Sequence, residues 1–265
     1  MKPKTTPDDL TDETIASYRE NGFVHIPGII AEEEIAVFYD AIQSFSEEMR
    51  AKQDEHRMVK DHEVFTQLVN FWSENEMIRR LTFHPNVGAV AEKLAGIKLR
   101  LWHDHVLIKQ PGKSQPTAYH QDRPFWPHDN ADHSLSAWIA LCDVPVERGC
   151  MSFITGSQRY TDLPPQSTRD ESILFDTCPE LRWEPRVMVP LKAGDCTFHH
   201  SRCAHMANAN STDMPRVAHV IIFTDITTTY SGKAHVVTDP LKMEPGDPLE
   251  GVLFPAVEAF GELRT

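Results

Sequence analysis

The chain has 265 residues, of which 40% are hydrophobic, so it can bury a sizeable core without help from disulfide bonds. Its five cysteines are odd in number and form no C-x-x-C pair, which argues against a disulfide framework or a thiolate zinc site. The net charge of −13 argues against nucleic acid or an anionic membrane as a partner. No apolar signal segment or membrane-spanning run is present, so we expect a cytoplasmic globular protein.

The N-terminal region is predicted to form a helix, a short strand and a longer helix. Ile15 and Tyr18 share one helical face, Gly22 is a stop signal, and residues 23–26 read as extended. The longer helix is indicated by apolar residues that recur at steps of three and four, namely Ile35, Phe38, Ile42, Phe45 and Met49. The polar residues 51–63 are expected to form a solvated loop or helix end.

Two short helices are predicted near 75–82 and 86–95, after which the pattern changes. Short runs rich in Val, Ile, Trp and Phe then follow one another, separated by turn residues. These runs are 97–109, 117–122, 135–145, 151–155, 187–191, 195–199, 203–208 and 216–224. Successive short strands with no helical pattern between them indicate a sandwich or barrel.

We therefore predict one domain over residues 1–265, mainly β with flanking helices. Residues 1–96 form a mainly helical part, 97–227 the barrel core, and 228–265 an irregular C-terminal tail. The polar connection 157–186 is longer than packing requires, so it is either a lid or an insertion.

A metal-binding pattern lies in one strand-like run. His120 and Asp122 are two residues apart, so in an extended chain both project from the same face and can chelate one ion. By itself the signal is weak, because about one H-x-D is expected by chance in a chain of this composition.

A second cluster of polar residues, from His205 to Arg216, could supply the remaining ligand of an iron site and a partner for a carboxylate. His205 would complete two histidines and one carboxylate, the facial triad of non-haem Fe(II) oxygenases, and Arg216 could grip a carboxylate with two parallel hydrogen bonds. Together these are the parts of a 2-oxoglutarate site. His200 remains an alternative third ligand, although only His205 keeps the expected offset from Arg216.

As a set, these segments resemble the phytanoyl-CoA dioxygenase family of Fe(II)/2-oxoglutarate oxygenases over most of the chain. The N-terminal YRENGFVHIPGIIAEEEI is similar to the helix, strand and helix of that family, and His120-Gln121-Asp122 to its H-x-D. Residues 137–141, 148–151 and 155–158 resemble its next strands and turn. His205, Asn210 and Arg216 stand at the offsets 0, +5 and +11 of its distal histidine, asparagine and arginine.

The resemblance implies a double-stranded β-helix, that is, a jelly-roll or cupin-like barrel, with N-terminal helices. It implies that His120, Asp122 and His205 are the catalytic metal ligands. The residues that it implies for 2-oxoglutarate binding are Arg216, Lys109, Trp138 and Asn210. The cofactors would be Fe(II), 2-oxoglutarate as cosubstrate, and O2. One departure is Ala207, which stands where the family often has a serine.

Asp122 also bears on the reaction, because related iron halogenases carry a small residue at the carboxylate position. We predict a dioxygenase that hydroxylates, or otherwise oxidises at a C–H bond, a small or medium organic metabolite and releases succinate and CO2. The alternative is a cupin-like barrel that binds a metal or ligand without oxygenase activity. The expected partner is a small molecule, with neither nucleic acid nor membrane involved, and the protein is expected to be a monomer or homodimer.

Candidate substrate contacts are the loop and strand residues His103, Arg123, Phe125 and Trp126. The pair His103 and His105 also raises the possibility of a cupin metal site, but no glutamate follows before Glu147. His128 and His133 flank an Asp-Asn loop and are expected to face solvent. Net negative charge disfavours an acyl-CoA, which carries several negative charges itself.

Overall fold

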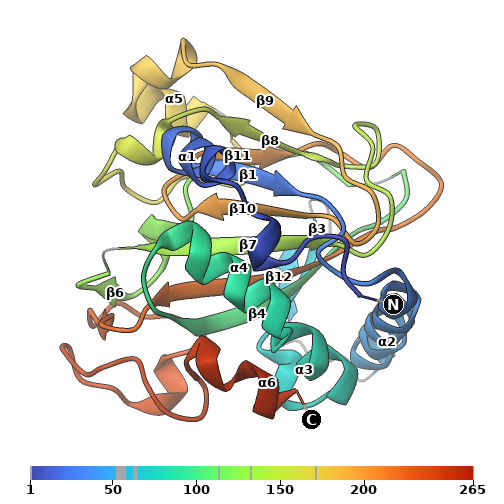
Figure 1. Cartoon of the computed structure of the whole chain (residues 1–265). Helices are drawn as coiled ribbons and strands as arrows, with labels where there is room; N and C mark the ends of the chain where they lie inside the picture. The colour runs from blue at the N-terminus through green and yellow to red at the C-terminus, as the bar shows by residue number, and fades with distance from the viewer. Residues whose placement is uncertain are drawn as a thin grey trace.

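Two antiparallel β-sheets form the centre of the protein (Figure 1). The computed structural model describes residues 2–51, 58–61, 65–112, 114–131, 133–170 and 172–264. The helices are α1 (Asp12–Asn21), α2 (Glu32–Ala51), α3 (Glu76–Thr82), α4 (Pro85–Ala95), α5 (Ser172–Thr177) and α6 (Phe260–Leu263). The strands are β1 (Phe23–Ile26), β2 (Met58–Asp61), β3 (Phe65–Val69), β4 (Leu99–Lys109), β5 (Thr117–His120), β6 (His128–Asp129), β7 (Ser134–Ala140), β8 (Met151–Ile154), β9 (Arg186–Val189), β10 (Cys196–His200), β11 (His205–Ala207), β12 (Arg216–Asp225) and β13 (Thr229–Tyr230).

The major sheet has the strand order β1-β10-β7-β12-β4-β3-β2, and the minor sheet has the order β5-β11-β8-β9. Neighbouring strands in both sheets are antiparallel. Non-consecutive neighbours such as β7 and β12 show that the chain crosses repeatedly between strands, as in a jelly roll. This arrangement confirms the predicted mainly β fold with flanking helices.

The N-terminal elements form where the sequence predicts them. The hydroxyl of Thr11 accepts a hydrogen bond from the backbone N–H of Thr14 and so caps α1, and Gly22 ends the helix with a φ of 82°. Pro85 stands in the first turn of α4, and Gly96 closes that helix with a φ of 76°. The described part of residues 1–96 thus contains four helices, but it also adds β1, β2 and β3 to the major sheet.

Helices cover one face of the major sheet and leave the other for the cavity. Alternate residues of β4 illustrate the division, because Val106 and Ile108 belong to the apolar core beneath the helices. Their neighbours His105 and Leu107 point to the opposite side and line a cavity between the sheets. Helices α3, α4 and α6 lie over the outer face (Figure 1). In the described residues no helix is long and apolar enough to cross a membrane.

The prediction of a solvated loop or helix end over residues 51–63 is wrong for residues 58–61, although helix α2 does end at Ala51. Residues 58–61 form β2, which pairs with β3, and β3 in turn pairs with β4. A polar stretch without apolar alternation carries no local pattern that predicts a strand. Hydrogen bonding to an adjacent strand is nevertheless sufficient to hold such a stretch in the extended conformation of a strand. Residues 52–57 and 62–63 of that run lie outside the described residues.

Candidate active site

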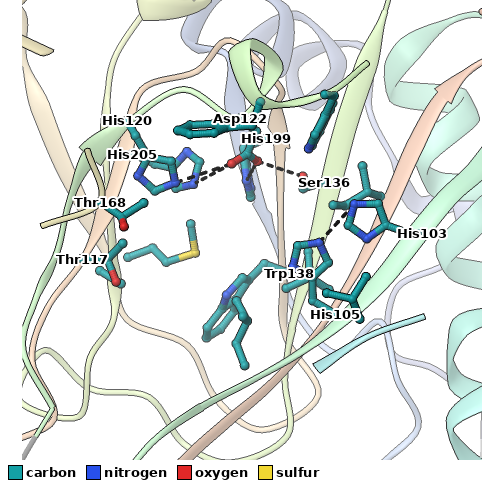
Figure 2. Close-up of a pocket in the computed structure, with 18 of the residues that line it drawn as sticks. His103, His105, Thr117, His120, Asp122, Ser136, Trp138, Thr168, His199 and His205 are labelled. Carbon is teal, nitrogen blue, oxygen red and sulfur yellow. Dashed lines mark hydrogen bonds and ion pairs between the residues drawn. The ribbon is translucent and has the colours of Figure 1, made fainter. Parts of the chain in front are cut away.

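A cavity of about 290 Å³ lies between the two sheets. Strands β4, β7, β10 and β12 of the major sheet line one side, and β5, β8 and β11 of the minor sheet line the other. Phe125 from the 3-10 helix Arg123–Phe125, Thr168 from the 157–186 connection, and His235 and Val236 from the C-terminal region also line the cavity. Figure 2 shows side chains from both sheets converging on this space.

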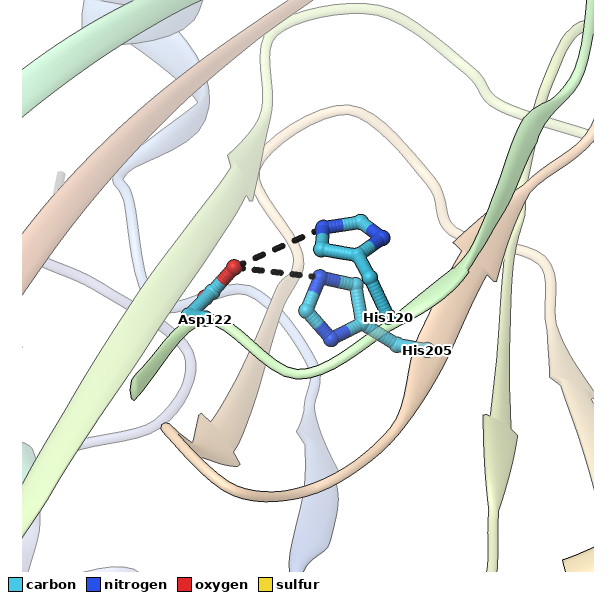
Figure 3. Close-up of side chains that lie close together, drawn as sticks. All are labelled: His120, Asp122 and His205. Carbon is cyan, nitrogen blue, oxygen red and sulfur yellow. Dashed lines mark ion pairs between the residues drawn. The ribbon is translucent and has the colours of Figure 1, made fainter. Parts of the chain in front are cut away.

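Three potential metal ligands meet at the minor-sheet side of the cavity (Figure 3). His120 ends β5 and is paired across the ladder with His205 of β11, so both rings leave the sheet side by side. Asp122 follows two residues after His120, and its Oδ1 lies 3.5 Å from Nε2 of His120 and 3.7 Å from Nε2 of His205. One ligand atom from each residue lies within 4.8 Å of the others. This donor set suits a divalent iron ion and leaves coordination positions open.

The two imidazoles are oriented for metal binding by backbone carbonyls. Nδ1 of His120 lies 2.8 Å from the carbonyl oxygen of Ala118, and Nδ1 of His205 lies 2.9 Å from that of Cys203. If each Nδ1–H donates to its carbonyl, each Nε2 keeps a lone pair directed at Asp122 and the metal position. The backbone therefore selects the tautomer that a metal requires.

The electrostatics of the triad favour an ionised carboxylate. Burial raises the pKa of Asp122, but His205, His120 and His199 outweigh this effect and hold the pKa well below its usual range. Burial lowers the pKa of His205 to about 3, so this ring is neutral and able to ligate. Burial lowers the pKa of His120, but the neighbouring Asp122 outweighs this effect and raises the pKa of that ring.

The second carboxylate oxygen of Asp122 has its own partners. Ser136 donates a hydrogen bond to Oδ2 over 3.3 Å, and Nε2 of His199 lies 3.7 Å from the same atom. Both residues line the cavity, and Figure 2 shows them beside Asp122. Sequence reasoning missed both residues in this position, because their approach to Asp122 depends on the pairing of β7 with β10.

Arg216 is a buried cation at the cavity wall with unused hydrogen-bonding capacity. Its side chain is 2% exposed, and its guanidinium lies 5.2 Å from the ring of Trp138, which also lines the cavity. One terminal nitrogen donates to the carbonyl of Leu107 over 3.3 Å, while Nε has no hydrogen-bond partner. Burial lowers its pKa to about 10, so it remains charged at neutral pH. A carboxylate is the natural partner for this group.

Two other residues predicted to bind 2-oxoglutarate lie outside the cavity lining. The ammonium of Lys109 donates to the carbonyl of Gln115 over 2.6 Å. The side-chain amide of Asn210 donates to the carbonyls of Lys109 and Met214. The contacts of Asn210 hold the loop that leads into β12, the strand that carries Arg216, whereas the contact of Lys109 holds the turn that follows β4.

A hydroxyl group lies next to Ala207, the residue that stands where the family often has a serine. Ala207 is paired across the ladder with Thr117 of β5, and both residues line the cavity. Figure 2 shows the hydroxyl of Thr117 on the cavity side. A hydroxyl is therefore present next to residue 207, on the neighbouring strand.

The predicted substrate contacts divide into two groups. His103, Phe125 and Trp126 line the cavity, whereas Arg123 does not and donates instead to the carbonyl of His128 over 2.8 Å. His105 also lines the cavity, with Nε2 3.4 Å from Nε2 of His103.

Three histidines outside the triad bear on the predictions made from the sequence, which concerned solvent exposure for two of them and metal binding for the third. His128 was expected to face solvent but is 4% exposed, because β6 pairs with β13 and the ring packs against Trp102. His133 is partly exposed, and its Nε2 lies 2.7 Å from the hydroxyl of Tyr18. His200 packs against His133 and does not join His120 and Asp122, whereas His205 does.

Comparison with known proteins agrees with this geometry. The chain matches the sequence profile described as "Phytanoyl-CoA dioxygenase (PhyH)" over residues 18–218. The solved structure of the non-heme alpha ketoglutarate dependent carbocyclase SnoK from nogalamycin biosynthesis is 38% identical, with a TM-score of 0.83 over 95% of this chain and 98% of that one. The epimerase SnoN from the same biosynthesis is 37% identical, with a TM-score of 0.78 over 93% of this chain and 95% of that one.

A curated relative, phytanoyl-CoA dioxygenase domain-containing protein 1 of Danio rerio, is 28% identical over 152 residues. That alignment covers 56% of this chain and 52% of the relative, so the chain spans about half the length of this relative. The profile match nevertheless covers most of the chain and includes the H-x-D pair, His205 and Arg216. The chain therefore belongs to the phytanoyl-CoA dioxygenase family of non-haem Fe(II)- and 2-oxoglutarate-dependent oxygenases.

Proposed function

We propose that this protein oxidises a small or medium organic metabolite at a C–H bond while converting 2-oxoglutarate and O2 into succinate and CO2. The observation that carries the proposal is the placement of Arg216, with its unpartnered Nε, in the same cavity as the His120, Asp122 and His205 triad. A barrel that only binds a metal has no need for a buried guanidinium aimed into the metal cavity. We therefore favour the oxygenase over the binding barrel.

The roles of the residues follow from their positions. His120, Asp122 and His205 would hold Fe(II), which supplies the O2 activation that no protein side chain can supply. Arg216 would bind the distal carboxylate of 2-oxoglutarate, and Trp138 would pack against the same guanidinium to keep it in place. The apolar side chains around these groups exclude water, which strengthens the ion pair with Arg216.

We propose that the substrate is a natural-product intermediate. The support is the likeness to SnoK and SnoN, a carbocyclase and an epimerase from nogalamycin biosynthesis. The substrate carbon is either hydroxylated, an outcome that the carboxylate of Asp122 favours over halogenation, or undergoes another change. That change would be the ring closure or epimerisation after which SnoK and SnoN are named. All three outcomes begin with the removal of hydrogen from a C–H bond.

The experiment is a turnover assay with purified protein, Fe(II), 2-oxoglutarate and O2, in which succinate release is followed with and without panels of candidate metabolites. We expect Asp122→Ala to abolish succinate release, because it removes one of the three ligands. Asp129→Ala is the matched control, since Asp129 is exposed on β6. Equal turnover in wild type and Asp122→Ala would overturn the proposal.

We further propose that the chain acts as one domain, in the cytoplasm, as a monomer or homodimer, and without nucleic acid or membrane partners. The net charge of −13 supports the last point. The test is a sedimentation measurement at micromolar concentration, where a larger assembly would contradict the proposed state.

A further inference from the structure

We propose that a second pocket, separate from the metal cavity, binds a phosphate group between the guanidinium groups of Arg123 and Arg202. This pocket has a volume of about 340 Å³, and we call it the arginine pocket. Its lining residues are Gln121, Arg123, Pro124, Trp126, Asp162, Leu163 and Arg202. None of the three metal ligands lines it, so the inference does not depend on the proposed function.

The arginine pocket lies beside the metal cavity. The 3-10 helix Arg123–Phe125 begins directly after Asp122 in the chain. Phe125 lines the metal cavity, whereas Arg123 and Pro124 line the arginine pocket, and Trp126 lines both. The helix and the indole ring therefore form a short wall between the two spaces. The sequence predicted Arg123 as a substrate contact, and this second pocket is the space that its side chain lines instead.

Both guanidinium groups keep hydrogen-bond donors that no protein group uses. Arg123 donates from one terminal nitrogen to the carbonyl of His128 over 2.8 Å, and its Nε has no hydrogen-bond partner. Within the part of the chain that the structure describes, the side chain of Arg202 makes neither a hydrogen bond nor an ion pair. Since a guanidinium carries five N–H donors, the two groups together can offer several bonds to a ligand.

The charges around the arginine pocket favour an anion. Burial, and after it the charge of Arg202, lower the pKa of Arg123, and burial and then Arg123 lower the pKa of Lys233. These effects show that like charges lie close together. Asp129 and Asp162 act in the opposite direction on Arg123, but among the described residues neither acid forms an ion pair with an arginine of the pocket. An anion between the two guanidinium groups would relieve their mutual repulsion.

The backbone holds the two arginines in place before any ligand binds. The backbone N–H groups of Asp122 and Arg123 both donate to the carbonyl of Ser201 over 2.9 Å. The side-chain amide of Gln121 donates to the carbonyl of Arg202 over 2.7 Å. These three bonds join the segment that carries Arg123 to the turn that carries Arg202. Because the backbone is already fixed, a ligand has to order only the two side chains.

Phosphate is the anion that suits two guanidinium groups. One guanidinium can satisfy both oxygens of a carboxylate with two parallel hydrogen bonds, whereas a phosphate group has enough oxygens to accept from two arginines at once. The phosphate could be free or carried by an organic molecule as an ester. Trp126 and Leu163 line the same pocket and provide an apolar surface against which the organic part of an ester would pack.

The test is titration calorimetry of the Fe(II) and 2-oxoglutarate complex with inorganic phosphate, under anaerobic conditions and at low salt. 2-Oxoglutarate is present so that Arg216 is not available to the probe. Arg202→Gln should weaken phosphate binding at least tenfold, because charge-assisted hydrogen bonds are lost. Arg182→Gln is the matched control, since it removes the same charge from a residue that pairs with Asp176 outside the arginine pocket. Equal affinity in Arg202→Gln and wild type, or no binding by wild type, would overturn the inference.

Two further arms sharpen the result. Asp162→Asn should tighten phosphate binding by up to about fivefold, because it removes a negative charge from the pocket lining, and weaker binding in this variant would contradict the site. Phenyl phosphate distinguishes the two sources of phosphate. Tighter binding of phenyl phosphate than of inorganic phosphate would assign the site to an ester, and equal or weaker binding would assign it to the free ion. Neither comparison requires turnover, so succinate formation tests the proposed function separately.

Discussion

His199 and Ser136 occupy directly opposite positions on β10 and β7, and both approach the same atom, Oδ2 of Asp122. The other oxygen, Oδ1, faces His120 and His205. The sheet thereby holds the carboxylate with one oxygen turned toward the two histidines. A carboxylate held in this way is positioned before the metal arrives, which lowers the ordering cost of binding.

The first prediction concerns this support. His199→Leu should weaken Fe(II) binding by about 10- to 100-fold, because Asp122 loses a partner that orients it. His199→Gln should recover part of the affinity by restoring a polar contact to Oδ2. Chelator competition under anaerobic conditions measures the affinity, with His200→Leu as the control because His200 lies against His133. Wild-type affinity in His199→Leu would show that the contact between His199 and Asp122 does not contribute to Fe(II) binding.

Arg216 provides the second prediction. Arg216→Leu should raise the KM for 2-oxoglutarate by about 100-fold, since the distal carboxylate would lose a buried charged partner. Arg216→Lys keeps the charge but not the planar guanidinium with its two parallel donors, so its KM should lie between those of wild type and Arg216→Leu. Initial rates of succinate formation at varied 2-oxoglutarate concentration give the KM of each variant. Arg159→Leu is the control, because Arg159 contacts the carbonyl of Glu20 outside the cavity.

Thr117 carries the third prediction. If its hydroxyl serves in place of the serine absent at Ala207, Thr117→Val should raise the KM for 2-oxoglutarate by about tenfold while the shape of the wall is preserved. Thr117→Ser should keep the wild-type KM. Equal KM values in Thr117→Val and wild type would remove Thr117 from the cosubstrate site.

Asp104 gives a prediction about stability and pH. It projects from β4 away from the cavity, accepts a hydrogen bond from Thr82 and lies 3.9 Å from His219. Burial raises its pKa to about 7 from 3.8. The folded protein therefore holds a proton that the unfolded chain has lost between these pH values. The contribution of Asp104 to the free energy of unfolding falls as pH rises through this window, by roughly 4 kcal/mol in total.

Urea unfolding at pH 5 and pH 7.5 tests this prediction. Asp104→Asn should lose less stability than wild type over that interval, because an amide does not titrate. Asp40→Asn serves as the control, since Asp40 is exposed on α2. Parallel changes in wild type and Asp104→Asn would mean that Asp104 is ionised in the folded protein throughout.

The sequence predicted the elements and triad that depend on short-range spacing. His120 and Asp122 share a face because of strand periodicity, and the structure brings His205 to them across one ladder. The predicted strand runs from 97 to 224 all contain an observed strand, and the largest difference in bounds is at 135–145, where β7 ends at Ala140. Spacing within one run of chain is visible in the sequence, so these predictions did not need the tertiary structure.

Features that depend on contacts between distant segments were missed. The approach of Ser136 and His199 to Asp122 follows from the register of β7 with β10, which no local pattern encodes. His128 is buried because β13, about a hundred residues later, pairs with β6. Lys109 matches the family position, yet the carbonyl of Gln115 takes its ammonium. For Ser136, His199 and His128 a partner remote in sequence decides where the side chain lies, whereas for Lys109 it is the turn six residues later.

The most direct test of the account is anaerobic reconstitution with Fe(II) followed by addition of 2-oxoglutarate, with the weak visible metal-to-ligand charge-transfer band as the readout. It needs no substrate. We expect the band to form in wild type and to be absent in His205→Ala, which lacks one of the three ligands. A folded protein that binds iron but forms no band with 2-oxoglutarate would contradict the account.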